Sequence, residues 1–122
     1  MTRNLDPRLA EAPSPLSRTL GFKLTDWTEG FARVEAPLAD HLMNRQGLPH
    51  GGVYAAMLDT AMGFAGCYTG DAKVRQNALT LSMTVNYLSR ATGKHLIAEA
   101  HVTGVENPRF SHAERCKMTR AR

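Results

Sequence analysis

The chain has 122 residues, of which 43% are hydrophobic and 21% are charged, and its net charge is +4. These values are ordinary for a globular protein, fit one domain spanning residues 1–122, and argue against disorder beyond the ends. The spacing of the two cysteines, Cys67 and Cys116, matches no metal or redox motif, so no disulfide is required. The first residues lack the apolar core of a signal peptide, and we therefore expect a cytoplasmic protein.

Basic residues are scattered along the chain except in the tail, residues 115–122. This tail is either a solvated surface or a patch that attracts a polyanionic ligand. Aromatic residues do not interleave with basic ones, so we expect no nucleic-acid partner. Residues 50–68 have about the length of a membrane span, near 20 residues, but they include Asp59 and four glycines, so we expect no membrane partner.

The N-terminal half predicts an arm followed by two strands. Residues 1–15 contain three prolines and read as an extended arm or a short helix. Alternation over 20–27 predicts a first strand, Glu29 and Gly30 a turn, and residues 31–37 a second strand that ends at a proline. Residues 38–49 are expected to form a loop.

Residues 51–68 predict one long helix. Apolar side chains recur at helical spacing, and most other positions are also apolar: Val53, Met57, Ala61, Phe64 and Tyr68 mark the spacing. A helix that is apolar nearly all round is normally buried on more than one side. Most of the larger apolar side chains of this helix are expected to pack in the core, and an acyl or aryl pocket is the alternative for some of them: Met57, Leu58, Met62, Phe64 and Tyr68.

The remaining sequence predicts three consecutive strands. The first and clearest is Leu79 to Leu88, where apolar and polar residues alternate strictly. Residues 96–103 alternate again, Asn107 and Pro108 indicate a hairpin turn, and residues 110–118 read as a last strand. Hairpin-linked strands with one embedded helix predict an α+β domain with an antiparallel sheet. One sheet and one helix leave an apolar face uncovered, which favours a homodimer.

Asp59 is the one carboxylate within this apolar helix. Its neighbours one turn away offer neither a charge nor a side-chain hydrogen bond: Ala55, Ala56, Met62 and Gly63. An unpaired buried carboxylate costs several kcal/mol unless a group outside the helix satisfies it. Such acids are often functional, and the alternative is a structural buried acid.

Gly51 and Gly52 open the helix, where the first backbone N–H groups lack partners and the helix dipole is positive. A ligand can approach glycine backbone closely, and an oxyanion would be stabilised there. The alternative is a flexible turn. His50 is either a site residue or a structural hydrogen-bonding group at the helix start. Asn44 is either a site residue or a turn residue in the preceding loop.

Gly51 and Asp59 are eight residues apart, which is about 12 Å of rise and about 800° of rotation along a helix. They therefore lie on different faces. If both act on one bond, Asp59 must come from a second subunit, which again favours a homodimer.

The string Asn44-Arg-Gln-Gly47-Leu-Pro-His50-Gly51-Gly52, followed by Asp59, resembles the hotdog-fold acyl-CoA thioesterases of the phenylacetate-degradation (PaaI-type) family. The similarity covers roughly residues 14–118. Residues 85–91 resemble a family strand that ends in Arg-Pro-Ala, although Ser89-Arg90-Ala91 lacks the proline. The resemblance implies an antiparallel sheet wrapped around one long central helix, interface sites in a homodimer, and often a dimer of dimers.

The resemblance also implies roles for the residues. The Gly51 N–H would polarise the thioester carbonyl, and Asp59 of the partner subunit would act as general base or nucleophile. Asn44 and His50 would position the thioester or the water, and Thr80 would orient the water. Gly52 and Arg90 would bind the substrate, with Arg90 meeting coenzyme A phosphates.

The hypothesis is therefore an acyl-CoA thioesterase that acts on an aryl- or acyl-CoA and needs no metal or cofactor. The alternative is a non-catalytic acyl-CoA binding or sensor protein on the same fold, against which the retained Asp59 argues. A hotdog hydratase or dehydratase is disfavoured, because no histidine follows Asp59 until His95.

Overall fold

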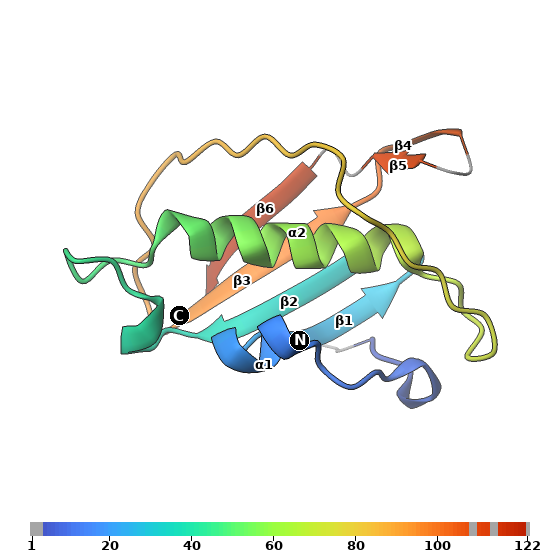
Figure 1. Cartoon of the computed structure of the whole chain (residues 1–122), viewed down its shortest axis with the longest axis horizontal. Helices are drawn as coiled ribbons and strands as arrows, with labels where there is room; N and C mark the ends of the chain where they lie inside the picture. Colours follow the sequence, from blue (N-terminus) through green and yellow to red (C-terminus); the bar gives the residue numbers. More distant parts are fainter. Residues whose placement is uncertain (1–3, 108–109, 113–114, 122) are drawn as a thin grey trace.

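The computed structural model describes residues 4–107, 110–112 and 115–121. One long helix lies across one face of a four-stranded antiparallel sheet with strand order β1-β2-β3-β6, and β4 and β5 form a separate two-stranded sheet (Figure 1). The elements in chain order are η1 (Pro7–Leu9), α1 (Pro15–Leu20), β1 (Lys23–Thr28), β2 (Phe31–Pro37), η2 (Asp40–Leu42), α2 (Gly51–Cys67), β3 (His95–His101), β4 (Gly104–Asn107), β5 (Phe110–His112) and β6 (Arg115–Ala121).

The first two strands form the predicted hairpin. Thr28 faces Phe31 across a two-residue loop, and Gly30 in that loop has a φ of 69°, which favours glycine. β2 has the predicted bounds, but β1 begins at Lys23 rather than at residue 20. The reason is the short helix α1, whose N-terminus is capped by the Ser14 side chain.

The inner face of the sheet carries mainly small side chains. β2 and β3 pair so that Ala32 faces Ala100 and Val34 faces Ala98, and all four are buried. Small residues let a helix approach a sheet closely, which is why α2 packs mainly on these two strands.

The buried residues of α2 follow the helical repeat. Four of them are spaced four residues apart, and a fifth extends the stripe: Val53, Met57, Ala61 and Ala65, with Leu58. Met57 is fully buried, which stabilises the fold by about 1.5–3 kcal/mol relative to an exposed side chain. At the far end of α2, the Trp27 indole N–H donates to the Phe64 carbonyl oxygen at 2.7 Å and so ties the last turns of the helix to β1.

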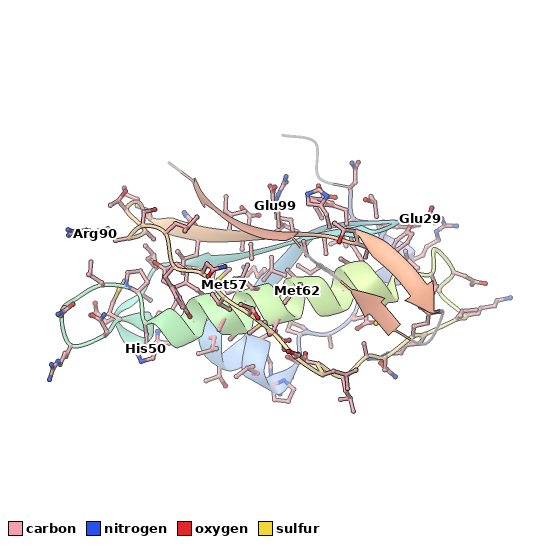
Figure 2. The ribbon with its side chains drawn as sticks, turned by 90° about the horizontal axis from the view of Figure 1, so that it is seen from above. Glu29, His50, Met57, Met62, Arg90 and Glu99 are labelled. Atoms are coloured by element: carbon pink, nitrogen blue, oxygen red, sulfur yellow. The ribbon has the colours of Figure 1, made fainter. Side chains whose placement is uncertain are left out.

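The outer face of the sheet carries a cluster of charged side chains that are buried or half-buried. Arg33 on β2 lies opposite Asp26 on β1 and Glu99 on β3, and its guanidinium reaches Glu99 at 2.9 Å and Asp26 at 3.6 Å. Figure 2 shows Glu99 on the side of the sheet that faces away from α2. One guanidinium thus attracts two carboxylates on the neighbouring strands, which favours the pairing of all three strands.

The predicted strand Leu79 to Leu88 is wrong for this structure. Residues 77–90 form neither helix nor strand and run back along α2 instead of joining the sheet (Figure 1). Leu79 is 92% exposed and Leu81 is 80% exposed, while Met83 and Val85 are half-buried. Alternation predicts a strand only where another strand supplies the hydrogen-bond ladder, and no described strand pairs with this segment.

The prediction for the C-terminal strands is partly confirmed. β3 matches the expected strand at 96–103 closely, but the single last strand predicted at 110–118 is two elements, β5 and β6. β5 pairs with β4, whereas β6 pairs with β3 from His95 opposite Ala121 to His101 opposite Arg115. The predicted turn residue Pro108 and the last residue of the basic tail, Arg122, lie outside the described residues.

Candidate active site

The loop before α2 is shaped by Asn44. Its side-chain oxygen accepts hydrogen bonds from the backbone N–H groups of Gln46 at 2.9 Å and Leu48 at 3.1 Å. Gly47 in this loop has a φ of 75°, and its N–H donates to the Asn44 carbonyl. The structure thus places Asn44 as a turn-forming residue, and the predicted contact with substrate or water stays a prediction.

His50 is the residue that caps α2. Its Nδ1 accepts the Gly52 N–H at 2.9 Å, and its carbonyl oxygen accepts the Val53 N–H at 2.9 Å. The second and third amides of the helix are therefore satisfied by one residue. The predicted role of His50 in positioning the thioester or water stays a prediction.

The Gly51 N–H is the first amide of α2, and no described residue accepts a hydrogen bond from it. It lies at the positive end of a 17-residue helix. An unpartnered amide at this position is suited to bind a carbonyl oxygen or an oxyanion. Gly51 is half-buried and Gly52 is exposed, so the helix start is accessible.

Tyr87 lies over this helix start. Its hydroxyl donates to the Gly51 carbonyl oxygen at 2.7 Å, and a Cβ added to Gly51 would meet the Tyr87 ring at 3.4 Å. Tyr54, in the first turn of α2, packs edge-on against Tyr87 with 6.0 Å between ring centroids. The sequence pattern gave Tyr87 only as one apolar position of a strand, so neither tyrosine was predicted as a site residue.

Asp59 is half-buried on α2, and its side chain is not unpaired. The Thr80 hydroxyl donates a hydrogen bond to Asp59 Oδ1, while Oδ2 has no hydrogen-bond partner among the described residues. The expectation of an isolated acid is therefore corrected, because residues 77–90 cross the helix and bring a hydroxyl to it. The structure does bring together Asp59 and Thr80, which the resemblance implied would activate and orient one water molecule.

The two halves of the predicted site are separated along α2. Gly51 and Asp59 are eight residues apart on one continuous helix, which corresponds to about 12 Å of rise. Reacting groups must lie about 3–3.5 Å apart, so one substrate carbonyl cannot contact both within a single chain. The contribution of a second subunit to the site stays a prediction.

Arg90 is exposed at the end of residues 77–90. Arg90 and His50 lie toward the same end of the molecule, where α2 begins (Figure 2). The predicted contact between Arg90 and coenzyme A phosphates stays a prediction.

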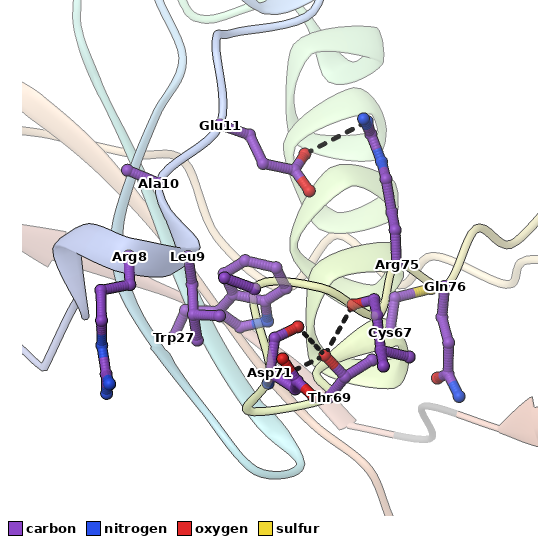
Figure 3. A pocket seen from close by; sticks show the side chains of 12 residues that line it. Arg8, Leu9, Ala10, Glu11, Trp27, Cys67, Thr69, Asp71, Arg75 and Gln76 are labelled. Carbon is purple, nitrogen blue, oxygen red and sulfur yellow. Dashed lines mark hydrogen bonds and ion pairs between the residues drawn. The ribbon is translucent and has the colours of Figure 1, made fainter.

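A separate pocket of about 160 Å³ lies at the opposite end of α2 (Figure 3). It contains none of the predicted site residues, and its lining includes an Arg75–Glu11 ion pair at 3.5 Å. Burial, and then the Glu11 charge, raise the pKa of the Cys67 thiol in its wall. The thiol is therefore protonated at neutral pH and does not have the environment of an activated nucleophile.

Two further features concern the described residues as a set. No group of three or more His, Cys, Asp or Glu side chains among them is arranged to hold a metal ion. None of the helices within 4–107, 110–112 and 115–121 has the length and apolar character needed to cross a bilayer.

Comparison with known proteins gives one family. The thioesterase superfamily model matches residues 46–110, which is more than half of the chain and includes Asp59 and the capped helix start. A protein of Halobacterium salinarum, whose name proposes an esterase activity, is 36% identical over 89 residues. The match covers 70% of this chain, and the chain spans only 58% of that relative's length.

Solved structures share the fold. A conserved protein of Pseudomonas aeruginosa aligns with a TM-score of 0.68 at 26% identity, covering 80% of this chain and 74% of that one. A thioesterase family protein of Silicibacter pomeroyi aligns with a TM-score of 0.63 at 26% identity, over 73% of this chain and 64% of its own. The Escherichia coli PaaI protein of the phenylacetic acid degradation operon shares the fold at a TM-score of 0.61 and 24% identity, covering 75% and 65%.

These matches confirm the α+β hotdog fold that the motif around Gly51 and Asp59 implied. The chain belongs to the thioesterase superfamily.

Proposed function

We propose that the chain is an acyl-CoA thioesterase, which hydrolyses an aryl- or acyl-CoA thioester to a free acid and coenzyme A. The observation that carries the proposal is the Gly51 N–H, which has no acceptor among the described residues while His50 satisfies the next two amides. A helix start that is otherwise capped and keeps one free amide has the form of an oxyanion site.

The reaction follows from the two polar groups of the site. The carbonyl oxygen of the thioester accepts the Gly51 N–H, which makes the carbonyl carbon more electrophilic. A water on Oδ2 of the partner subunit's Asp59 attacks that carbon, its proton passes to the carboxylate, and the negative charge develops on the oxygen at Gly51. The carbonyl double bond then re-forms from the oxyanion, the C–S bond breaks, and the thiolate of coenzyme A leaves with the proton that Asp59 took from the water.

Asp59 acts in this scheme as general base, and direct attack by its carboxylate to give an acyl anhydride is the other route. The hydrogen bond from Thr80 to Oδ1 supports either route, because it fixes the carboxylate while Oδ2 stays free among the described residues. The roles of Asn44, Gly52 and Arg90 in holding the substrate belong to the same proposal.

The proposed active form is a homodimer, in which Gly51 of one subunit and Asp59 of the other meet at one substrate. The separation of the two residues along α2 supports it, because one chain supplies only half of each site. Exposed apolar side chains on residues 77–90 also support it, since such patches commonly mark association surfaces: Leu79, Leu81, Tyr87 and Leu88. A dimer of dimers remains part of the proposal.

The test is release of free thiol from a panel of acyl- and aryl-CoA esters. Wild-type protein should hydrolyse at least one ester, and Asp59→Asn should lower kcat by about 10²–10⁴-fold, because it removes the base or nucleophile but keeps the size of the side chain. Circular dichroism should show that the variant is folded. Wild-type turnover by Asp59→Asn would show that the assigned mechanism is wrong.

A wild-type protein that binds acyl-CoA in calorimetry without releasing thiol would instead identify a non-catalytic binding protein. The same panel therefore separates the proposed enzyme from the alternative with the same fold.

A further inference from the structure

The peptide group between Gly51 and Gly52 is held at both of its polar ends. Its carbonyl oxygen accepts the Tyr87 hydroxyl at 2.7 Å, and its N–H donates to His50 Nδ1 at 2.9 Å. A peptide group is planar, so two hydrogen bonds at opposite ends fix the orientation of the whole unit. One of the two side chains comes from the preceding loop and the other from 36 residues further along the chain.

Two successive glycines need such restraint more than other residues. Glycine has the widest backbone freedom, and a Gly-Gly pair at a helix start can rotate at little steric cost. The Gly51 N–H is joined to the clamped peptide group through the Gly51 Cα. Fixing that peptide group therefore limits the directions in which the Gly51 N–H can point.

Tyr87 is itself held in place although it is 58% exposed. Its ring lies against Gly51 and packs edge-on against Tyr54, with an interplanar angle of 75°. The Tyr54 hydroxyl in turn accepts the Ala91 N–H at 3.3 Å, which ties the chain just after Tyr87 back to the helix. The hydroxyl of Tyr87 therefore reaches Gly51 from a supported ring.

We propose that Tyr87 is a positioning residue, which acts together with His50 to clamp the Gly51–Gly52 peptide group and aim the Gly51 N–H at the substrate carbonyl. This inference rests on the proposed thioesterase function. Tyr87 touches neither the substrate nor the reacting atoms in this scheme, and it acts through Gly51.

The first test is Tyr87→Phe, which keeps the ring and removes only the hydroxyl. Removal of an oxyanion donor costs about 10²–10³-fold in kcat, and we expect a smaller loss of about tenfold when the donor is merely mis-aimed. KM should change less than about twofold, because the aim matters most once the oxyanion forms. Tyr68→Phe is the matched control, because the structure packs Tyr68 against Trp27 and the core at the other end of α2, away from the helix start. This variant should retain wild-type kcat.

The second test does not depend on activity. The chain contains 10 glycines, so labelling with [¹⁵N]glycine gives a small set of amide signals. Tyr87→Phe should shift the signals of Gly51 and Gly52 and speed hydrogen exchange at Gly52, because the hydrogen bond to the Gly51 carbonyl is lost. The ring is kept, so a change in ring current does not account for the shifts. Tyr68→Phe should instead shift Gly70, which lies beside the Tyr68 ring, since a Cβ added to Gly70 would meet that ring at 3.5 Å.

The outcomes are distinguishable. An active wild-type enzyme with unchanged kcat and unchanged Gly51 and Gly52 signals in Tyr87→Phe would overturn the clamp and leave the proposed function standing. A wild-type chain that hydrolyses no thioester would overturn the proposed function, and the glycine signals would then report on the hydrogen bond alone. A fall in kcat together with shifts confined to Gly51 and Gly52 is the result that we expect.

Discussion

Gly51 differs from its neighbours in the first turn of α2, because the N–H groups of Gly52 and Val53 are both satisfied by His50. The residue before it, His50, has φ −63° and ψ 137°, which is extended backbone. This conformation suits a residue that precedes proline, and the first position of a helix tolerates proline well. The backbone donor can therefore be removed without disturbing the helix.

Gly51→Pro should lower kcat by about 10²–10³-fold, because it removes the N–H that faces the developing oxyanion. The melting temperature should stay within a few degrees of the wild-type value. Gly51→Ala is the control, since it keeps the N–H and its Cβ would meet the Tyr87 ring at an ordinary contact distance of 3.4 Å. Equal rates for the proline and alanine variants in the thiol-release assay would exclude Gly51 as the donor.

The residues of the site were predictable to different degrees. The apolar surroundings of Asp59 in the sequence singled it out, and unpartnered helix-start amides follow from helix geometry. The partner Thr80 lies 21 residues away and came only from the resemblance to a family. Tyr87 was missed because its contact with Gly51 spans 36 residues, and no local pattern encodes it.

At the scale of elements, α2 is held to the sheet at its C-terminal end by Trp27. The indole N–H donates to the Phe64 carbonyl oxygen, and the ring packs edge-on against the Phe64 ring at 5.2 Å. The last carbonyl groups of a helix lack intrahelical partners, so a donor from β1 stabilises the helix where it ends.

Trp27→Phe should lower the free energy of unfolding by about 1–3 kcal/mol, because it removes this hydrogen bond and part of a buried ring. Chemical denaturation measures the change. Since Trp27 lies at the far end of α2 from Gly51, kcat should remain near the wild-type value. A variant as stable as the wild type would show that the indole does not anchor the helix.

Local patterns predicted those elements whose partners are close in sequence. The hairpin of β1 and β2 follows from alternation around Glu29 and Gly30, and the helix follows from its apolar repeat. The segment 77–90 carries an equally clear alternation but forms no strand, because a strand also needs a neighbour with which to pair. Residues 1–15 were interpreted as an extended arm or a short helix, whereas α1 begins at Pro15, the last residue of that segment, and ends at Leu20, so its position was not predicted.

At the scale of the whole molecule, the proposed homodimer makes each site from two chains. Gly51→Pro should remove the oxyanion donor that a subunit contributes to one site. Asp59→Ala should remove the carboxylate that a subunit contributes to the other site. A heterodimer of the two variants would then contain one fully defective site and one intact site.

The two variants should be co-expressed with different affinity tags and the heterodimer purified. We expect about half of the wild-type activity, because one of the two sites in the heterodimer is intact. Each variant alone is the control and should be nearly inactive. A heterodimer as inactive as its parents would show that both groups act within one chain.

The rigid spacing of about 12 Å between Gly51 and Asp59 also bears on regulation. A continuous helix cannot shorten, so no rearrangement inside a single subunit would bring its own Gly51 and Asp59 to one substrate carbonyl, as the proposed mechanism requires. Specific activity should then fall upon dilution below the dissociation constant of the assembly, and the abundance of the protein in the cell would itself control turnover.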